Sequence, residues 1–388
     1  MAPLDGLRVL DLTRLMPGPL CTMILGDLGA DIIKIEQPEV GDFTRVAPPF
    51  IADTGVTFLA LNRNKRSITL NLKNHDSHEV VRKLVLSSDV FVESFQPGLA
   101  QSLGVGYETI SGINKGTIYC SISGYGQTGP YRDLVGHDIN YISYGGTLGA
   151  TGQESGPPII PATQVSDIQA ALYAAMAIVA ALYRREKTGK GEYIDISLMD
   201  AAVASMIIPL TFHSAGAPVD RGTLFLSGGV PFYNVYETAD HKFISIGAIE
   251  PKFWAELCRT LTLEKYEDQQ FASAAFEQIR VDLAAAFRQK TRDEWVRLLN
   301  GREIPCAPVY DVDQVPGDPH VRSRGMIFRM ETAAFGRLSQ LATPIRMTKN
   351  PLSVRLPPPK LGEHTLQILH GLGYSEKDVQ RFKTAGAI

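Results

Sequence analysis

The stretch LRVLDLTRLMPGPLCTMILGDLGADIIKIEQP, residues 7–38, decides the fold class. LRVLDLT is a short apolar run that predicts a strand, CTMILGDLG favours a helix, and ADIIKIE predicts a second strand that ends before Pro38. A strand, a turn, a helix and a strand in this order are typical of a parallel sheet with a Rossmann-like beginning. The turn holds a single glycine between two prolines, so the glycine-rich fingerprint of a dinucleotide site is missing.

The alternation of strands and helices continues to about residue 125. SITLNL, DVFVESF and GTIYCSIS predict further strands, and HEVVRKLVLSS predicts a helix. A long helix is expected to start at Asp167, because five apolar residues then recur at helical spacing: Ile168, Leu172, Met176, Val179 and Leu182. These patterns predict an α/β domain with a parallel sheet.

Two later segments have a different character. Residues 214–231 are rich in Gly and Pro and predict a linker or loop. Residues 232–325 alternate as a hairpin and then turn helical, which predicts a smaller α+β domain.

Composition and charge exclude several classes of protein. The chain has 388 residues, 44% of them apolar, and a net charge of −3, so no nucleic-acid or anionic membrane partner is indicated. Its 4 cysteines are far apart, which suggests neither a zinc site nor a disulfide framework. The longest wholly apolar run, residues 170–183, is too short for a membrane span and predicts a buried helix. With no secretion signal at the start, a cytoplasmic protein is expected.

The segment GHDIN, residues 136–140, sets a histidine beside an aspartate among small residues, with Asp167 at 167 − 137 = 30 positions after His137. His137 is either a surface group, a core group with its hydrogen bonds satisfied, or a proton-transfer group near neutral pH. Asp167 is either a helix cap or a base or nucleophile, and a position at a helix start is expected to lower its pKa. Only burial or a neighbouring charge would suit it to act as an acid. Glu250, in GAIEPKFW, is either a helix-start residue or a partner that orients an imidazole.

Anion binding has weaker candidates. NRNKRS supplies Arg63, Lys65 and Arg66, which are either a solvated loop or contacts for a phosphate-bearing ligand. SGYGQTGP contains Gly124 and Tyr125, where backbone N–H groups are free to approach a ligand, although glycine turns are common.

Nine motifs, in this order, resemble the family III coenzyme A transferases (CaiB/BaiF), a group that includes the α-methylacyl-CoA racemases. They are LDGLRVLDLT, GPLCTMILGDLGADIIKIEQP, NRNKRSITLNLK, SGYGQTGP, GHDINY, TGKGEYIDISLMDA, GAIEPKFW, IPCAPV and LGEHT. The resemblance implies a large Rossmann-like domain made of residues 1–213 and 326–388, and an interlocked homodimer. It also implies an active site between the large domain of one chain and the small domain of the other.

Within this family the resemblance favours a racemase. Transferases of the family use the aspartate that matches Asp167 as a nucleophile and usually carry an aromatic residue where His137 stands. Racemases share GHDINY, the later aspartate and the glutamate of GAIEP, so we expect His137 and Asp167 to move protons and Glu250 to hold His137. The backbone N–H of Asp138 is the expected donor to an enolate oxygen. No metal or redox cofactor is required for this chemistry. Coenzyme A takes part only as a portion of the substrate thioester.

The expected contacts to coenzyme A are Arg63, Lys65, Arg66, Ile35, Gly124 and Tyr125. The chain departs from the family at Gln37 and Gln96, where arginines that contact phosphates are often found. We therefore expect a racemase of 2-methyl-branched acyl-CoA thioesters. A transferase with Asp167 as nucleophile is the first alternative, and a non-catalytic acyl-CoA-binding protein is the second.

Overall fold

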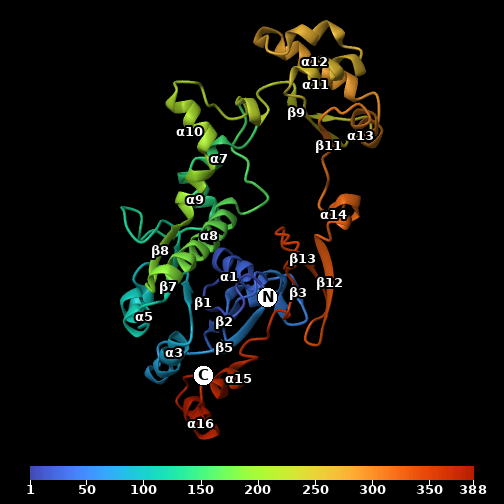
Figure 1. Cartoon of the computed structure of the whole chain (residues 1–388). Helices are drawn as coiled ribbons and strands as arrows, with labels where there is room; N and C mark the ends of the chain where they lie inside the picture. Colours follow the sequence, from blue (N-terminus) through green and yellow to red (C-terminus); the bar gives the residue numbers. More distant parts are fainter. The chain divides into compact units, whose positions relative to one another are not determined.

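A computed structural model describes residues 1–388, which form two compact units. Unit 1 comprises Met1–Gly145, Thr163–Ser205 and Arg322–Ile388, and unit 2 comprises Gly146–Ala162 and Met206–Val321. Figure 1 follows the chain through both units.

Unit 1 is built on a sheet of six strands in the order β5-β2-β1-β6-β7-β8, in which every neighbouring pair is parallel. The strands are β1 (Arg8–Leu12), β2 (Asp31–Glu36), β5 (Lys65–Thr69), β6 (Val90–Glu93), β7 (Ile118–Ser123) and β8 (Glu192–Ser197). From β1 the chain first adds strands on one side and then returns to add β6 on the other. In such sheets ligands bind beyond the carboxyl ends of the strands at this reversal, here between β1 and β6.

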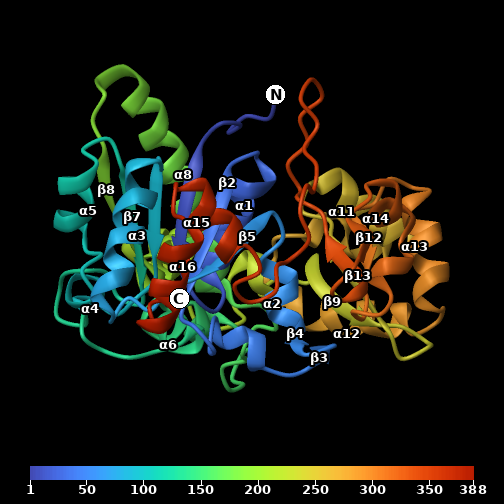
Figure 2. The ribbon, with the colours of Figure 1, turned by 90° about the horizontal axis from the view of Figure 1, so that it is seen from below.

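Helices cover both faces of this sheet because successive side chains of a buried strand point to opposite faces. Val9 of β1 packs in one core with α1 (Pro17–Asp27) and α8 (Val165–Thr188). Leu10 packs in the other core with α3 (His75–Leu86), α5 (Tyr107–Ile113), α15 (Thr365–Gly371) and α16 (Glu376–Thr384). Figure 2 shows the red C-terminal helices α15 and α16 beside α3, so the end of the chain completes the core of its beginning.

Unit 1 has several shorter elements. They are β3 (Phe50–Ile51), β4 (Thr54–Gly55), α2 (Val56–Leu61), α4 (Leu99–Ser102), α6 (Asp138–Tyr144), α9 (Leu198–Ser205), the antiparallel pair β12 (Ile327–Thr332) and β13 (Gly336–Leu341), and a 3-10 turn at Phe43–Val46.

Unit 2 has an antiparallel sheet in the order β11-β10-β9, with helices packed on it. Its core is rich in aromatic side chains, among them Phe232, Trp254, Phe287 and Trp295. The elements are α7 (Thr147–Ala150), α10 (Ile207–Ser214), β9 (Tyr233–Glu237), β10 (Phe243–Gly247), α11 (Pro251–Thr260), α12 (Phe276–Phe287), α13 (Arg292–Asn300) and β11 (Cys306–Pro308). Four 3-10 turns, at Phe225–Ser227, Glu264–Gln269, Ser273–Ala275 and Val315–Gly317, lie between them, and α14 (Pro319–Ser323) follows.

The structure confirms the mixed α/β architecture, the parallel sheet and the predicted strands and helix up to residue 125. The units differ in their bounds from the predicted domains. Residues 146–162 group with unit 2, the second part of unit 2 starts at Met206, and the chain rejoins unit 1 at Arg322. Residues 214–231, predicted as a linker or loop, lie within unit 2 and are mostly loop, with one 3-10 turn at Phe225–Ser227.

The helix expected from Asp167 begins at Val165, and it is only partly buried where a buried helix was predicted. α8 has 24 residues, and an 18-residue window within it has a mean hydropathy of 1.7. By length and composition it could therefore cross a membrane, as core helices of soluble proteins also could. Only 44% of its apolar window is buried. Alanines make most of the buried face, whereas Leu172, Met176 and Val179 of the predicted apolar stripe are exposed.

Candidate active site

The segment Gly136–Tyr141 is held in place by its own side chains. His137 lies just before α6, and its backbone N–H donates to Oδ1 of Asn140 at 3.0 Å. The hydroxyl of Tyr141 donates to the carbonyl of Gly136 at 2.5 Å. The ring of Tyr141 occupies the space next to two glycines: a Cβ would stand 2.6 Å from the ring at Gly124 and 2.9 Å at Gly136. The glycines therefore let the loop that carries His137 pack at the end of β7.

Asp138 joins this loop to the start of α8. Its Oδ1 accepts the backbone N–H of Ser166 at 2.8 Å, the hydroxyl of Ser166 at 2.6 Å and the N–H of Asp167 at 3.4 Å. A helix leaves its first N–H groups without partners inside the helix, and the Asp138 carboxylate satisfies two of them. The structure thereby brings His137 and Asp167, 30 positions apart (167 − 137), to one place.

This place is a cavity of about 800 Å³ in unit 1, here called cavity B. It has 21 lining residues: Arg14, Leu15, Pro17, Ser94, Phe95, Gln96, Pro97, Ile122, Ser123, Gly124, Arg132, Leu134, Val135, Gly136, His137, Asp138, Asn140, Tyr141, Gln164, Asp167 and Leu198. The imidazole of His137 is exposed and Asp167 is half-buried. The cavity therefore places two titratable side chains, His137 and Asp167, in a wall that mixes polar and apolar residues.

Asp167 does not have the lowered pKa expected for a carboxylate at a helix start. Burial and the negative charge of Asp138 raise the pKa of Asp167 to about 7. Desolvation and a like charge both disfavour the ionised form, and here they outweigh the helix terminus. Both forms of the carboxyl are therefore accessible near neutral pH, which suits it to accept and to return a proton.

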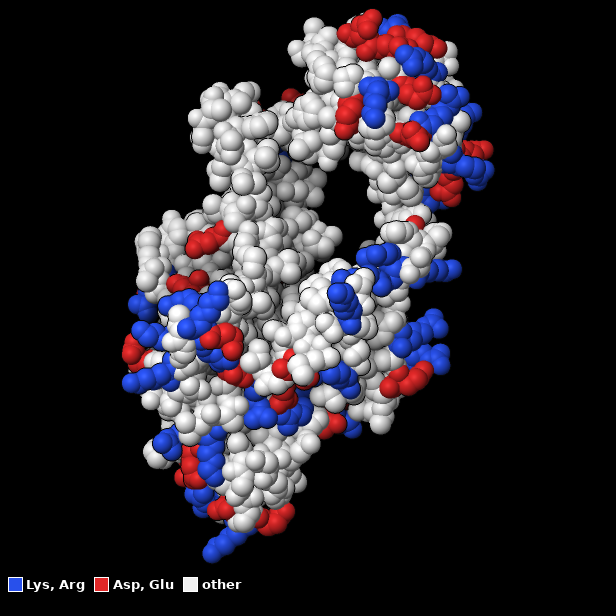
Figure 3. All heavy atoms as spheres, in the orientation of Figure 1, with Lys and Arg blue, Asp and Glu red and all other residues white.

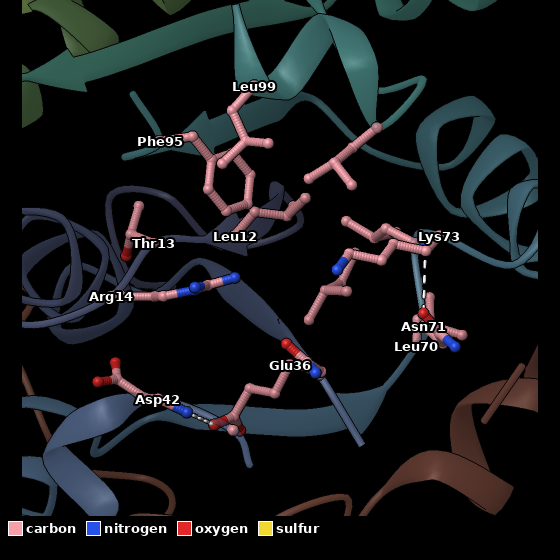
Figure 4. A pocket seen from close by; sticks show the side chains of 15 residues that line it. Leu12, Thr13, Arg14, Glu36, Asp42, Leu70, Asn71, Lys73, Phe95 and Leu99 are labelled. Carbon is pink, nitrogen blue, oxygen red and sulfur yellow. Dashed lines mark hydrogen bonds between the residues drawn. The ribbon is translucent and has the colours of Figure 1, made fainter. Parts of the chain in front are cut away.

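A second cavity, here called cavity A, has a volume of about 230 Å³ and lies beyond the carboxyl ends of β1, β2, β5 and β6. It is lined by Leu12, Thr13, Arg14, Ile35, Glu36, Gln37, Gly41, Asp42, Leu70, Asn71, Leu72, Lys73, Phe95, Leu99 and Leu103. In Figure 4 the side chains of Arg14 and Lys73 point into this cavity from opposite sides. Neither side chain forms an ion pair within the chain, so both are available to an anion.

Arg14 borders both cavities, and Phe95 does too. The guanidinium carbon of Arg14 lies 5.2 Å from the ring centre of Phe95 and 5.3 Å from that of Phe43. Burial lowers the pKa of Arg14, although the charge of Asp42 opposes the shift. Arg14 and Lys73 were not among the residues expected from the sequence to bind a ligand. Arg14 lies two residues after the end of β1, where sheets of this kind bind ligands, and this position could have revealed it.

Of the three basic residues expected to bind phosphate, two have other roles. Arg63 and Lys65 are 2% and 0% exposed. Arg63 pairs with Asp27 at 2.6 Å, and Lys65 pairs with Asp11 at 3.0 Å. Burying a cation is costly unless it is paired, so these two serve the core and present no charge to a ligand. Neither the solvated-loop interpretation nor the phosphate interpretation holds for them.

Arg66, the third basic residue, pairs with Asp31 at 2.6 Å and keeps a side chain 20% exposed. The other expected contacts lie nearer to the cavities. Ile35 lines cavity A and Gly124 lines cavity B. Gln37 and Gln96, which stand where the family often has arginines, line cavity A and cavity B. Tyr125 is 9% exposed and its ring packs edge-on against Tyr141, so it supports the wall of cavity B from behind.

Glu250 lies in unit 2, directly before Pro251 at the start of α11. This confirms its position at a helix start. Its expected pairing with His137, which belongs to unit 1, stays a prediction.

Comparison of the sequence with known proteins shows the family of the chain. The model of CoA-transferase family III matches residues 4–365. Succinyl-CoA:glutarate CoA-transferase of Homo sapiens is 34% identical over 394 residues, which cover 100% of this chain and 90% of the relative. Alpha-methylacyl-CoA racemase of Mus musculus is 33% identical over 386 residues, which cover 97% and 95%.

A solved structure agrees with these sequence matches. The crystal structure of a CAIB/BAIF family protein from Brucella suis has a TM-score of 0.84 and 33% identity, covering 96% of this chain and 99% of that chain. The sequence relatives include transferases and racemases at nearly equal identity, so these matches do not separate the two activities.

Proposed function

The chain belongs to CoA-transferase family III, and from this membership we propose that it is a racemase of 2-methyl-branched acyl-CoA thioesters. The observation that carries the proposal is that His137 and Asp167 line one cavity. Racemisation next to a thioester carbonyl requires one group to remove the α-proton and another to return a proton on the opposite face of a planar enolate. Two titratable groups of different type at one cavity fit this requirement.

The two cavities suggest how the substrate binds. They share Arg14 and Phe95, so a long ligand that spans both would pass this pair. Arg14 and Lys73 suit the phosphate-bearing end of coenzyme A in cavity A, since phosphates are bound by arginine and lysine. The thioester and its α-carbon would then lie in cavity B beside His137 and Asp167.

The remaining roles follow from the local structure. Removal of the α-proton places negative charge on the thioester oxygen, which a hydrogen-bond donor must stabilise. The backbone N–H of Asp138 has no partner in the chain, because Asp138 is the first residue of α6. We assign it this role, and Glu250 the role of favouring the imidazolium form of His137. Coenzyme A enters as part of the substrate, and no other group takes part in these steps.

A CoA transferase is the second candidate. The match to succinyl-CoA:glutarate CoA-transferase favours it, since that relative is as similar as the racemase. In this reaction the Asp167 carboxylate attacks the thioester carbonyl, the C–S bond breaks, and the thiolate of coenzyme A leaves a mixed anhydride on Asp167. The exposed imidazole of His137 has no chemical step in this scheme, which is why the racemase is preferred.

Two further proposals are based on the resemblance to the family. We propose that the protein acts as a homodimer and in the cytoplasm. The surface of α8 supports the first proposal, because Leu172, Met176 and Tyr183 are 53%, 61% and 66% exposed. A row of large apolar side chains on one helix is typical of a surface that a partner covers.

Proton exchange tests the proposed function. The purified chain is incubated with (S)-2-methylacyl-CoA in D2O, and deuterium at the α-carbon and the enantiomer ratio are followed together. We expect deuterium uptake as the mixture becomes racemic, and loss of racemisation in both His137→Ala and Asp167→Asn.

The transferase alternative makes a different prediction in the same samples. Absence of deuterium uptake, together with transfer of coenzyme A to added succinate that requires Asp167 but not His137, would overturn the racemase. Trapping with hydroxylamine would then mark the peptide that contains Asp167, because an anhydride on this carboxyl is open to attack.

A further inference from the structure

Glu93, the last residue of β6, is a buried carboxyl group without an ion pair. The residue is 3% exposed, and β6 lies inside the sheet between β1 and β7. Burial raises the pKa of Glu93 to about 7. A carboxyl group in such a place costs stability, and an apolar residue at this position would avoid the cost. This loss of stability indicates that the carboxyl of Glu93 serves a function other than stabilising the fold.

Both oxygens of Glu93 have defined partners. Oε1 contacts the hydroxyl of Ser121, which is the residue opposite Glu93 on β7. The side-chain amide of Gln127 donates to the same hydroxyl at 2.8 Å, so this side of the carboxyl is anchored. Oε2 accepts the backbone N–H of Phe95 at 2.7 Å. Because Phe95 is only two residues further along, this hydrogen bond closes a bend where the chain leaves the sheet.

The bend, residues 94–97, forms a wall of the candidate site. All four residues line cavity B, and Phe95 lines cavity A as well. The hydroxyl of Ser94 accepts the backbone N–H of Arg14 at 3.0 Å, and the ring of Phe95 packs beside the Arg14 guanidinium. The carboxyl of Glu93 therefore fixes, through the bend, the aromatic ring and the cation at the junction of the two cavities.

We propose that Glu93 is a positioning residue for substrate binding, whose carboxyl sets the 94–97 bend so that Phe95 and Arg14 are aligned for a ligand that spans both cavities. The inference rests on the proposed acyl-CoA substrate. Glu93 touches none of the reacting atoms in this scheme and acts through Phe95 and Arg14. Its effect is therefore expected in the affinity for the substrate and not in the chemical step.

Two conservative variants separate position from charge. Glu93→Gln keeps the length of the side chain, an acceptor for the Phe95 N–H and a donor for Ser121, but loses the charge. Glu93→Asp keeps the charge but is one methylene too short to reach both partners. If position matters, the Gln variant binds coenzyme A within about twofold of the wild-type affinity. The Asp variant loses about tenfold, the effect of roughly one hydrogen bond to a charged group.

The measurements are the Kd for coenzyme A by titration calorimetry, the KM and kcat for 2-methylacyl-CoA, and the thermal midpoint of each full-length variant. We expect KM of the Asp variant to rise with Kd while kcat stays within about threefold. A purely structural role would lower the thermal midpoints of the variants and leave Kd unchanged.

The proposal fails if the Asp variant binds coenzyme A like the wild type, or if the Gln variant binds as weakly as the Asp variant. If the Asp variant does not fold, a tenfold loss of coenzyme A affinity in the Gln variant would still overturn the proposal. If the wild-type chain binds coenzyme A but does not racemise the substrate, the proposed reaction is overturned. The effect of Glu93 on coenzyme A affinity can still be tested in that case.

Discussion

At the scale of single residues, the unusual group is the Asp167 carboxyl, whose pKa of about 7 depends on a neighbour. Asp138 contributes its negative charge and also accepts hydrogen bonds from the first turn of α8. Asp138→Asn removes the charge but keeps an oxygen that accepts these hydrogen bonds. We therefore expect the pKa of Asp167 to fall in this variant while the geometry of the loop is retained.

The sign of the effect on activity follows from the ionised form. When Asp167 acts as the base it must be a carboxylate, so this step is lost as the pH falls through its pKa. In Asp138→Asn we expect the acidic limb of the profile of kcat/KM against pH to move to lower pH by roughly one unit. Asp133→Asn is the control, because Asp133 lies in the same loop with a side chain 83% exposed. An unchanged profile in Asp138→Asn would contradict the assigned origin of the shift.

The sequence located these residues better than it described their surroundings. His137 and Asp167 were found because histidine and aspartate are conspicuous among small and apolar neighbours. The raised pKa of Asp167 was not predicted, because it depends on burial of this carboxyl and on the charge of Asp138, which is 29 positions away along the chain. The burial of Arg63 and Lys65 was missed for a similar reason, since their partners Asp27 and Asp11 are 36 and 54 positions away.

At the scale of elements, α8 shows that apolar periodicity predicts a helix but not which of its faces is buried. The spacing of Leu172, Met176 and Val179 correctly predicted a helix, but these side chains lie on its exposed face. The buried face is made mainly of small residues such as Ala170, Ala171 and Ala174. Small side chains let α8 approach the sheet and α1 closely. A search of the sequence for apolar periodicity instead selects the larger side chains as the buried ones. Periodicity predicts which residues share a face, and only packing decides which face is covered.

The exposed face gives a prediction about self-association. Figure 3 shows few charged side chains over α9, and its helical neighbour in unit 1, α8, carries the row of large apolar residues. Met176→Glu places a charge in the middle of this row. If a second copy of the chain covers the face, burying this charge costs several kcal/mol and the dimer dissociates. We expect light scattering to show a dimer for the wild type and a monomer for this variant.

A carboxylate at the polar end of the same helix provides the control. Thr188→Glu introduces the same charge at the last residue of α8, which is exposed, and should leave the dimer intact. The thermal midpoint of Met176→Glu measured at low protein concentration should match that of a dissociated wild type. A wild-type chain that is monomeric at all concentrations would contradict the proposed homodimer.

At the scale of the whole molecule, the two units carry different candidate residues. Both cavities, together with His137 and Asp167, are formed by unit 1 alone, so binding of coenzyme A should depend on unit 1. Glu250 belongs to unit 2, at the start of a helix with an apolar inner face. The sequence predicted a large α/β part and a smaller α+β part, because sheet and helix patterns are local. It gave the bounds less well, because residues 146–162 carry no pattern that reveals which core they join.

Because Glu250 belongs to unit 2 and unit 1 forms both cavities, a change at Glu250 should affect turnover but not coenzyme A binding. Glu250→Gln keeps the shape of the side chain and removes the charge that would favour the imidazolium form of His137. We expect racemisation to fall about a hundredfold, the lower end of what general acid–base catalysis contributes, because Glu250 acts through His137. The Kd for coenzyme A is expected to stay within about twofold. Glu256→Gln on the same helix is the matched control, since Glu256 pairs with Arg259 and Arg302 near the surface. Equal activity of the two variants would remove Glu250 from the mechanism, and a loss of coenzyme A affinity in Glu250→Gln alone would place it in binding instead.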